Sequence, residues 1–148
     1  MDCQSRAGFS VIELIVVLTL MAILLAIGIP ASSKLLLSYQ LNGSARRVQT
    51  ELQNIKMRAA AENLGFQFAY GAGGGSYTIR RNGSAVVSKP LPEGIVITQA
   101  GTVSFSPRGT AGSTRIRLQS REGVCKQVVV SATGRIRVCN PAGCSEDC

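Results

Sequence analysis

The stretch that decides the fold is residues 9–30, FSVIELIVVLTLMAILLAIGIP, in which Glu13 is the only charged residue. A helix rises about 1.5 Å per residue, so roughly 20 apolar residues cross a hydrocarbon core of about 30 Å. We therefore predict a membrane-spanning helix over residues 9–30. A carboxylate in such a helix is costly unless it is paired, so Glu13 is expected to meet a partner, such as the N-terminal amine of another chain.

The residues around this stretch carry a family resemblance. Residues 6–30, RAGFSVIELIVVLTLMAILLAIGIP, resemble the N-terminus of type IV pilins, minor pilins and type II secretion pseudopilins. The resemblance implies a prepilin leader of residues 1–8, which a prepilin peptidase removes by cleavage between Gly8 and Phe9, followed by methylation of Phe9. The competing interpretation is a secretory signal peptide, which is disfavoured because the apolar run is long and contains an acidic residue.

The same resemblance assigns assembly roles to two residues. Glu13 matches the family's glutamate at the fifth mature position, which pairs with a neighbouring subunit's N-terminal amine, and Pro30 matches the helix-kinking proline. The implied location is the inner membrane, crossed once and with a periplasmic domain, and then a pilus or pseudopilus. The implied partners are other pilin or pseudopilin subunits, the prepilin peptidase and inner-membrane lipid.

An amphipathic pattern follows the apolar stretch. Six apolar residues recur at alternating spacings of four and three, which places one stripe along a helix: Leu41, Ala45, Val48, Leu52, Ile55 and Ala59. We predict that the helix continues over residues 31–64, with a weak point at Asn42-Gly43 and a stop near Asn63 supplied by Gly65. The stripe is expected to pack against a sheet.

From Gly65 onward, apolar and polar residues alternate in short runs separated by glycine-containing turns, which is typical of β-strands. We predict eight strands, over residues 65–70, 76–81, 85–88, 95–99, 102–106, 114–119, 125–131 and 135–139. The expected fold class is α+β, with a long N-terminal helix packed on a mostly antiparallel sheet and a β-rich globular domain over residues 65–148. The family resemblance implies that this is a pilin-like fold.

The C-terminal part resembles the GspH/FimT branch of the pilin family. In that branch a Phe-x-Pro-x-Gly turn, matched here by residues 105–109, precedes three terminal strands and a Gly-Arg-x-Arg element. Gly134, Arg135 and Arg137 match this element. FimT-type minor pilins are DNA receptors for natural transformation and use the element, so the resemblance implies a minor pilin that binds double-stranded DNA.

Charge points to the same chemistry. The formal net charge is +8, which favours an anionic partner. Residues two apart in a strand share a face, so Arg135 and Arg137 form one pair and Arg115 and Arg117 form another. If the two faces coincide, four guanidiniums with Lys126 at their edge would hold phosphates without regard to base sequence. The competing interpretation is a solvated strand face.

The remaining aromatic and basic residues refine this hypothesis. Tyr70 and Tyr77 are the aromatic residues expected on the sheet surface, and two are too few for a base-stacking platform, so backbone contact is expected. Arg46 and Arg47, on the helix, are expected to contribute less to DNA binding. The alternative function is a structural or initiating minor pilin, or a GspH-like pseudopilin of a type II secretion system, that does not bind DNA.

The mature chain would keep four cysteines, because Cys3 lies in the leader: Cys125, Cys139, Cys144 and Cys148. An even number in an exported domain favours disulfides over a zinc site, for which the spacing lacks Cys-x-x-Cys pairs. A tight turn at Thr133-Gly134 would set Cys125 opposite Pro141 or Ala142, with Cys139 diagonal to it. Cys125–Cys139 with Cys144–Cys148 is the preferred pairing, and Cys125–Cys144 is its near competitor.

Catalysis is disfavoured by the residue inventory. The sequence has no histidine, so serine and cysteine nucleophiles lack their usual base, and the carboxylates form no recognisable acid–base pair. We therefore expect no enzymatic activity, no catalytic residues, no metal and no cofactor.

Overall fold

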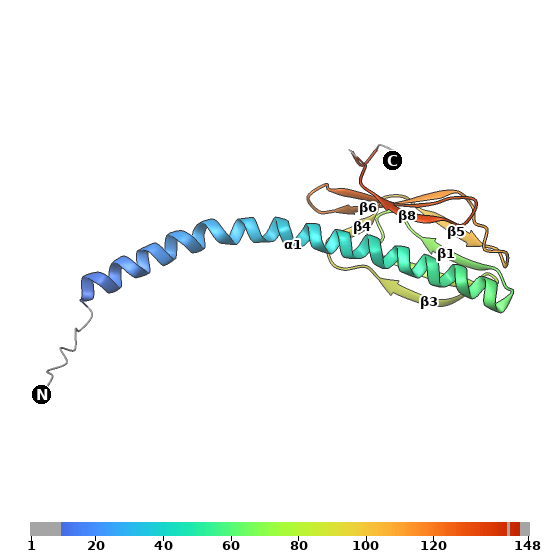
Figure 1. Ribbon diagram of the computed structural model, residues 1–148, viewed down its shortest axis with the longest axis horizontal. Coiled ribbons are helices and arrows are strands. Elements are labelled where there is room, and N and C mark those ends of the chain that lie inside the picture. Colours follow the sequence, from blue (N-terminus) through green and yellow to red (C-terminus); the bar gives the residue numbers. More distant parts are fainter. Residues whose placement is uncertain (1–9, 142, 146–148) are drawn as a thin grey trace, which may run out of the picture. The chain divides into compact units, whose positions relative to one another are not determined.

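The computed structural model describes residues 10–141 and 143–145, with the side chains of residues 27–34 left undescribed. This part of the chain contains one helix, α1 (Val11–Glu62), and eight strands (Figure 1). The chain divides into two compact units, Met1–Leu36 and Leu37–Cys148. The described part of the chain is α+β, as the sequence predicts.

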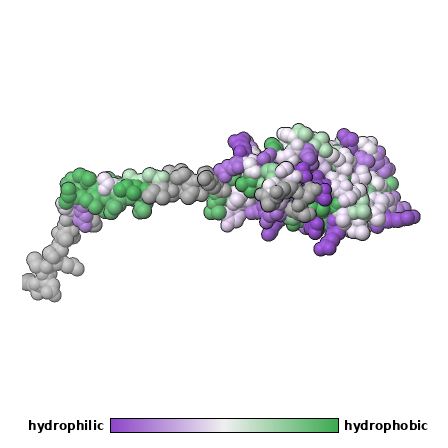
Figure 2. All heavy atoms as spheres, turned by 90° about the horizontal axis from the view of Figure 1, so that it is seen from above, coloured by the Kyte–Doolittle hydropathy of each residue, from purple (hydrophilic) through white to green (hydrophobic). Residues whose placement is uncertain are grey.

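The first unit contains the N-terminal part of α1. The described side chains from Val11 to Ala26 are exposed and almost all apolar, and they form the green surface of this segment in Figure 2. The Leu14 amide donates to the Ser10 carbonyl oxygen over 3.2 Å, and Glu13 lies in the first turn, where the helix dipole favours a carboxylate. No helix in the described part of the chain meets the length and hydropathy needed to cross a membrane.

Three N-terminal predictions lie wholly or partly beyond what the structure describes. The leader, residues 1–8, and the cleavage junction between Gly8 and Phe9 fall outside the described residues. The backbone is helical through Pro30, whose side chain is among those left undescribed.

The second unit contains all eight strands, arranged as two antiparallel sheets of four strands each. The first sheet has the order β3-β2-β1-β5 and the second the order β4-β6-β7-β8. Their bounds are β1 (Phe66–Tyr70), β2 (Ser76–Arg81), β3 (Ser84–Pro90), β4 (Ile95–Ile97), β5 (Gly101–Phe105), β6 (Thr114–Ser120), β7 (Cys125–Val130) and β8 (Ile136–Cys139). The sequence pattern finds every strand within about two residues, but it cannot say which strands pair, and so it predicts one sheet where the chain forms two.

The apolar stripe of α1 packs into a core shared by both sheets. Its six predicted members are all buried, together with the inward-facing residues of the strands, such as Phe68 of β1 and Val128 of β7. Every buried hydrophobic residue among those described belongs to the unit Leu37–Cys148. This unit therefore has a core of its own, and we expect it to fold without the N-terminal segment.

The C-terminal end of α1 differs from its prediction in one detail. Asn63 has a φ of 52°, so it adopts the left-handed conformation that ends the helix, and Gly65 is not the residue that does so. Asparagine tolerates this conformation better than most residues. Glu62 then ties the helix end to β2, because its carboxylate accepts from Arg58 and from Arg81, each over 3.1 Å.

The predicted weak point at Asn42-Gly43 does not interrupt the helix. The next residue, Ser44, is buried and its hydroxyl donates to the Gln40 carbonyl oxygen over 2.7 Å. Leu41 and Ala45, on either side, belong to the core. Packing against the sheets therefore outweighs the intrinsic preference of about 1 kcal/mol against glycine in a helix.

Candidate functional site

Two of the predicted arginines lie in one row across the second sheet. Arg115 of β6 pairs with Val129 of β7, and Val129 pairs with Arg137 of β8. Directly opposite residues of antiparallel strands point to the same face, so both guanidiniums project from the face opposite to the core. Two strand spacings place their backbones about 10 Å apart. Arg115 and Arg137 are both exposed.

Arg117 occupies the next row of the same face. It pairs with Gln127, which in turn pairs with Cys139. Arg117 is half-buried and Gln127 is fully buried, because the C-terminal segment packs beside this row: the Gln119 amide donates to Cys144 Sγ over 3.4 Å. Arg117 and Arg115 each make further interactions with the chain. Arg117 is therefore less accessible than Arg115.

Arg135 precedes β8 and is held in place by Gly134. Gly134 is buried, has a φ of 72°, and lies so close to Gly109 that an added Cβ would overlap the Gly109 carbonyl oxygen. Lys56 of α1 donates from Nζ to the Gly134 carbonyl oxygen over 3.0 Å. A glycine is thus required here by both conformation and space, and it fixes where the following arginines begin.

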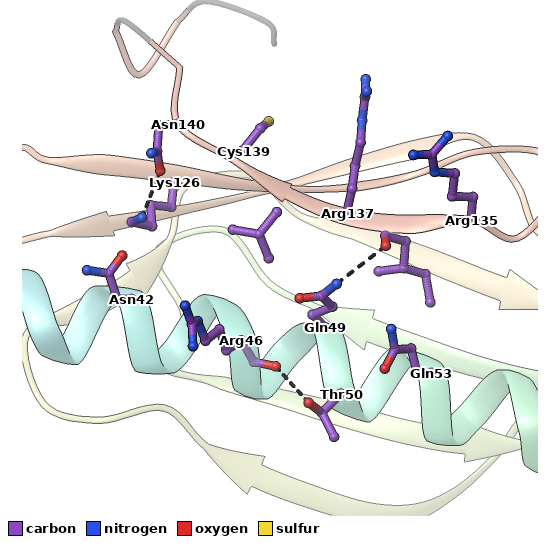
Figure 3. A pocket seen from close by; sticks show the side chains of 12 residues that line it. Asn42, Arg46, Gln49, Thr50, Gln53, Lys126, Arg135, Arg137, Cys139 and Asn140 are labelled. Atoms are coloured by element: carbon purple, nitrogen blue, oxygen red, sulfur yellow. Dashed lines mark hydrogen bonds between the residues drawn. The ribbon is translucent and has the colours of Figure 1, made fainter.

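Arg135 and Arg137 both extend to the side of β8 away from α1 (Figure 3). Both are exposed, and neither forms an ion pair with any carboxylate in the described part of the chain. Guanidiniums without a carboxylate partner retain their donors for a phosphate.

Lys126 is not part of this face. It pairs with Leu118, which is fully buried, so its side chain leaves the sheet on the core side. Its Nζ donates to Asn140 Oδ1 over 2.7 Å. The prediction that Lys126 borders the arginines on one surface is wrong, because the alternation of β7 sends Gln127 and Val129 to that surface and Lys126 to the other.

A polar groove lies between α1 and β8 within the second unit (Figure 3). Its volume is about 730 Å³, and its lining includes Arg46 and Gln49 of α1 together with Lys126, Arg135 and Arg137. Gln49 donates from Nε2 to the Ile136 carbonyl oxygen over 3.4 Å, so the helix closes part of the free edge of β8. Arg46 is a residue that sequence reasoning placed outside the site, since no pattern relates a helix position to a strand 90 residues later.

The two tyrosines predicted to be available on the sheet are buried. Tyr70 is 7% exposed and Tyr77 is 1% exposed, and both belong to the core. Burial raises the pKa of each phenol above its ordinary value, and the Glu51 carboxylate raises the pKa of Tyr77 further. Neither ring can stack on a base, and Tyr39, 66% exposed, is the large exposed aromatic residue among those described.

The disulfide pairing also differs from the preferred prediction. Cys125 is bonded to Cys144, with their Cα atoms 5.3 Å apart, so the preference for Cys125–Cys139 is wrong and its near competitor is the pair that forms. The register explains this result: Gln127 pairs with Cys139, which leaves Cys125 diagonal to Cys139. Diagonal side chains are about 7–8 Å apart, beyond disulfide reach. Cys139 is disulfide-bonded as well, and Cys148 lies outside the described residues.

No group of three or more histidine, cysteine, aspartate or glutamate side chains within the described residues is arranged to hold a metal ion. Of the described carboxylates, Glu51 pairs with Lys89 and Glu62 pairs with Arg58 and Arg81. The outer face of the second sheet offers cationic hydrogen-bond donors, the exposed guanidiniums of Arg115, Arg135 and Arg137.

Comparison with known proteins agrees with the fold and with the N-terminal motif. The prokaryotic N-terminal methylation motif matches residues 3–29. The minor pseudopilin EpsH from the type 2 secretion system of Vibrio cholerae superimposes with a TM-score of 0.59 at 12% identity, covering 70% of this chain and 98% of that one. This chain carries the methylation motif and has a pilin-like fold.

The pilin-like protein is also similar to the type IV minor pilin FimU of Pseudomonas aeruginosa, in two crystal forms. One gives a TM-score of 0.57 at 14% identity over 72% of this chain and 96% of FimU. The other gives 0.54 at 16% identity over 70% and 99%. No curated protein sequence matches at a significant level. The N-terminal motif and the fold expected from the sequence are confirmed, and at these identities the structural likeness is one of fold.

Proposed function

We propose that this pilin-like protein is a minor pilin of the FimT type, which joins a pilus or pseudopilus and binds DNA non-specifically for uptake in natural transformation. The observation that carries the DNA-binding part is the row Arg115–Val129–Arg137, whose two arginines are exposed, together with exposed Arg135 two residues before Arg137. A surface with several guanidiniums in fixed positions is suited to the phosphates of a duplex.

Assembly is proposed to use the N-terminal segment. The methylation motif over residues 3–29 supports processing between Gly8 and Phe9. Residues 9–30, which would begin the mature chain, contain one charged residue and are proposed to lie in the inner membrane. Glu13 would then pair with the N-terminal amine of a neighbouring subunit. The second unit would lie in the periplasm and later on the filament.

Binding would depend on phosphates. Each guanidinium can donate two hydrogen bonds to one phosphate, and each contact releases counterions from the DNA, so affinity falls as salt rises. Base sequence would matter little, because the tyrosines that could stack are buried. Within the unit Leu37–Cys148, Lys and Arg residues outnumber Asp and Glu residues by 14 to 6, which steers DNA toward it.

The test is a salt-titrated DNA-binding assay on residues 38–148, with two unrelated duplexes. The double variant Arg135→Gln plus Arg137→Gln should weaken binding to both duplexes and flatten the log–log salt slope by up to about two contacts. Its melting temperature should stay normal, since exposed substitutions usually change stability by no more than about 0.5 kcal/mol. The matched control is Arg47→Gln plus Arg80→Gln, which removes the same charge from two other exposed positions.

A second function is a structural minor pilin or pseudopilin without DNA binding. It is favoured by the likeness in fold to EpsH, whose name assigns it to a type 2 secretion system. A folded double variant that binds DNA as well as the control does would remove the receptor function and leave this structural one.

A further inference from the structure

The groove between α1 and β8 joins cations from parts of the chain that are distant in sequence. Arg46 borders it on the helix side and Lys126 on the β7 side, while Arg135 and Arg137 line its β8 rim and extend their guanidiniums to the other side of that strand (Figure 3). No carboxylate belongs to the lining that the structure describes. A cleft lined by charges of one sign concentrates the electrostatic field, so this groove attracts anions more strongly than the same charges spread over a flat surface.

Uncharged polar groups complete the lining. Asn42 and Gln53 project from the same side of α1 as Arg46, and Asn140 lies at the far end of β8. Thr50 lies on that side as well, but its hydroxyl donates to the Arg46 carbonyl oxygen over 3.0 Å. Since Asn140 accepts from Lys126 through Oδ1, its amide group is the part of the side chain that can donate. Amide N–H groups and cations can both donate hydrogen bonds to phosphate oxygens, whereas carbonyl oxygens can only accept.

The size of the groove limits its occupant. Its 730 Å³ falls within the range of about 300–1,000 Å³ that holds a drug-sized molecule, which is enough for a few linked phosphates and sugars and too little for a duplex. We infer that the groove holds the phosphodiester backbone of one DNA strand, with Arg46 as a phosphate contact. The DNA interface thus continues from the outer face of the second sheet, around β8, to the helix. This inference rests on the proposed function.

Arg47 supplies a matched comparison for Arg46. The two residues are adjacent, both are exposed arginines, and successive helix positions differ in direction by about 100°. Arg47 lies beside Tyr77 of β2, where its positive charge partly offsets the rise that burial causes in the pKa of Tyr77. Arg47 does not line the groove. Substituting either residue removes one charge from nearly the same place in the chain, but only one of the substitutions changes the groove.

The experiment uses the full chain in a neutral detergent and a fluorescent 20-bp duplex, titrated with salt. Arg46→Gln and Arg137→Gln should each lower the log–log salt slope by about one and raise Kd roughly eightfold near 0.1 M salt. Arg47→Gln should leave the slope unchanged. Inorganic polyphosphate should displace the duplex from the wild-type chain, and polyglutamate of equal charge should do so less well, because it lacks linked phosphates.

The outcomes separate the two proposals. If Arg137→Gln weakens binding while Arg46→Gln and Arg47→Gln behave alike, the groove inference is wrong and the proposed function stands. If polyglutamate competes as well as polyphosphate does, the assignment of the groove to a phosphodiester is wrong. If the wild-type chain binds no duplex, the proposed function itself is wrong.

Discussion

The two halves of α1 belong to one helix but differ in how their apolar side chains are arranged and covered. From Val11 to Ala26 the described side chains are apolar in nearly every direction and all are exposed. From Leu41 to Ala59 the apolar residues form one stripe, and each of them is buried by the sheets. An apolar surface without internal cover requires lipid or another protein to cover it, whereas a one-sided stripe is satisfied within the chain. We therefore expect the first half to make contacts between molecules, whereas the second half packs within one.

The largest expected effect is the loss of filament incorporation when the Glu13 carboxylate of the first half is removed. Glu13→Ala should sharply reduce incorporation into filaments, because the carboxylate would no longer pair with a neighbouring subunit's amine, while membrane insertion becomes easier. The fraction of the chain recovered in sheared filaments measures this effect. Glu93→Ala, which removes an exposed carboxylate from the second unit, is the control. Normal incorporation of the Glu13 variant would show that this charge has no role in assembly.

Truncating one leucine in each half tests the comparison directly. Leu52 is fully buried, so Leu52→Ala should lower the free energy of unfolding of the second unit by about 2–5 kcal/mol. Leu18 is exposed, so Leu18→Ala should change that free energy by less than about 0.5 kcal/mol. Urea unfolding of the full chain, followed by circular dichroism, measures both. Equal losses in the two variants would mean that the first half contributes to the stability of the folded unit.

The second half of α1 also holds the segment before β8, through Lys56 and Gly134. Gly134→Ala should cost about 1–3 kcal/mol, since alanine is strained at positive φ and its methyl group would overlap Gly109. Gly83→Ala is the matched control, because Gly83 has a φ of 84° and no atom within 4 Å of an added Cβ. Its loss should be smaller, about 1 kcal/mol. Thermal melting that gives equal losses would contradict the close packing described for Gly134.

The sequence predicts the elements of this fold well because their signals are local. The alternation in Thr114–Ser120 and the stripe from Leu41 to Ala59 depend on each element's own period, and both are found as predicted. Pairing between distant segments has no such local signal. The second sheet is therefore missed, since it depends on β4 joining β6, which lies beyond β5 in the chain.

The candidate site was predictable to the same extent. Arg115, Arg117 and Arg137 could be placed on strand faces by counting in steps of two, and the structure puts these faces on one side of one sheet. The prediction put Lys126 beside the arginines because it used charge, and charge does not decide on which face of β7 a residue lies. Arg46 could not be found, since its position beside β8 is decided by how the whole helix packs on the sheets.

The buried stripe of α1 has a consequence for tension. Its six side chains are spread from Leu41 to Ala59, about 27 Å along the helix axis, and all of them are embedded in the same core. A pull along this half of the helix is resisted by all six contacts at once, and by the hydrogen bonds from Gln49 and Lys56 to the backbone around β8. We expect this half of the helix to separate from the sheets only when all six contacts give way together. We therefore expect the arginines beside β8 to keep their positions when this half of the helix is pulled.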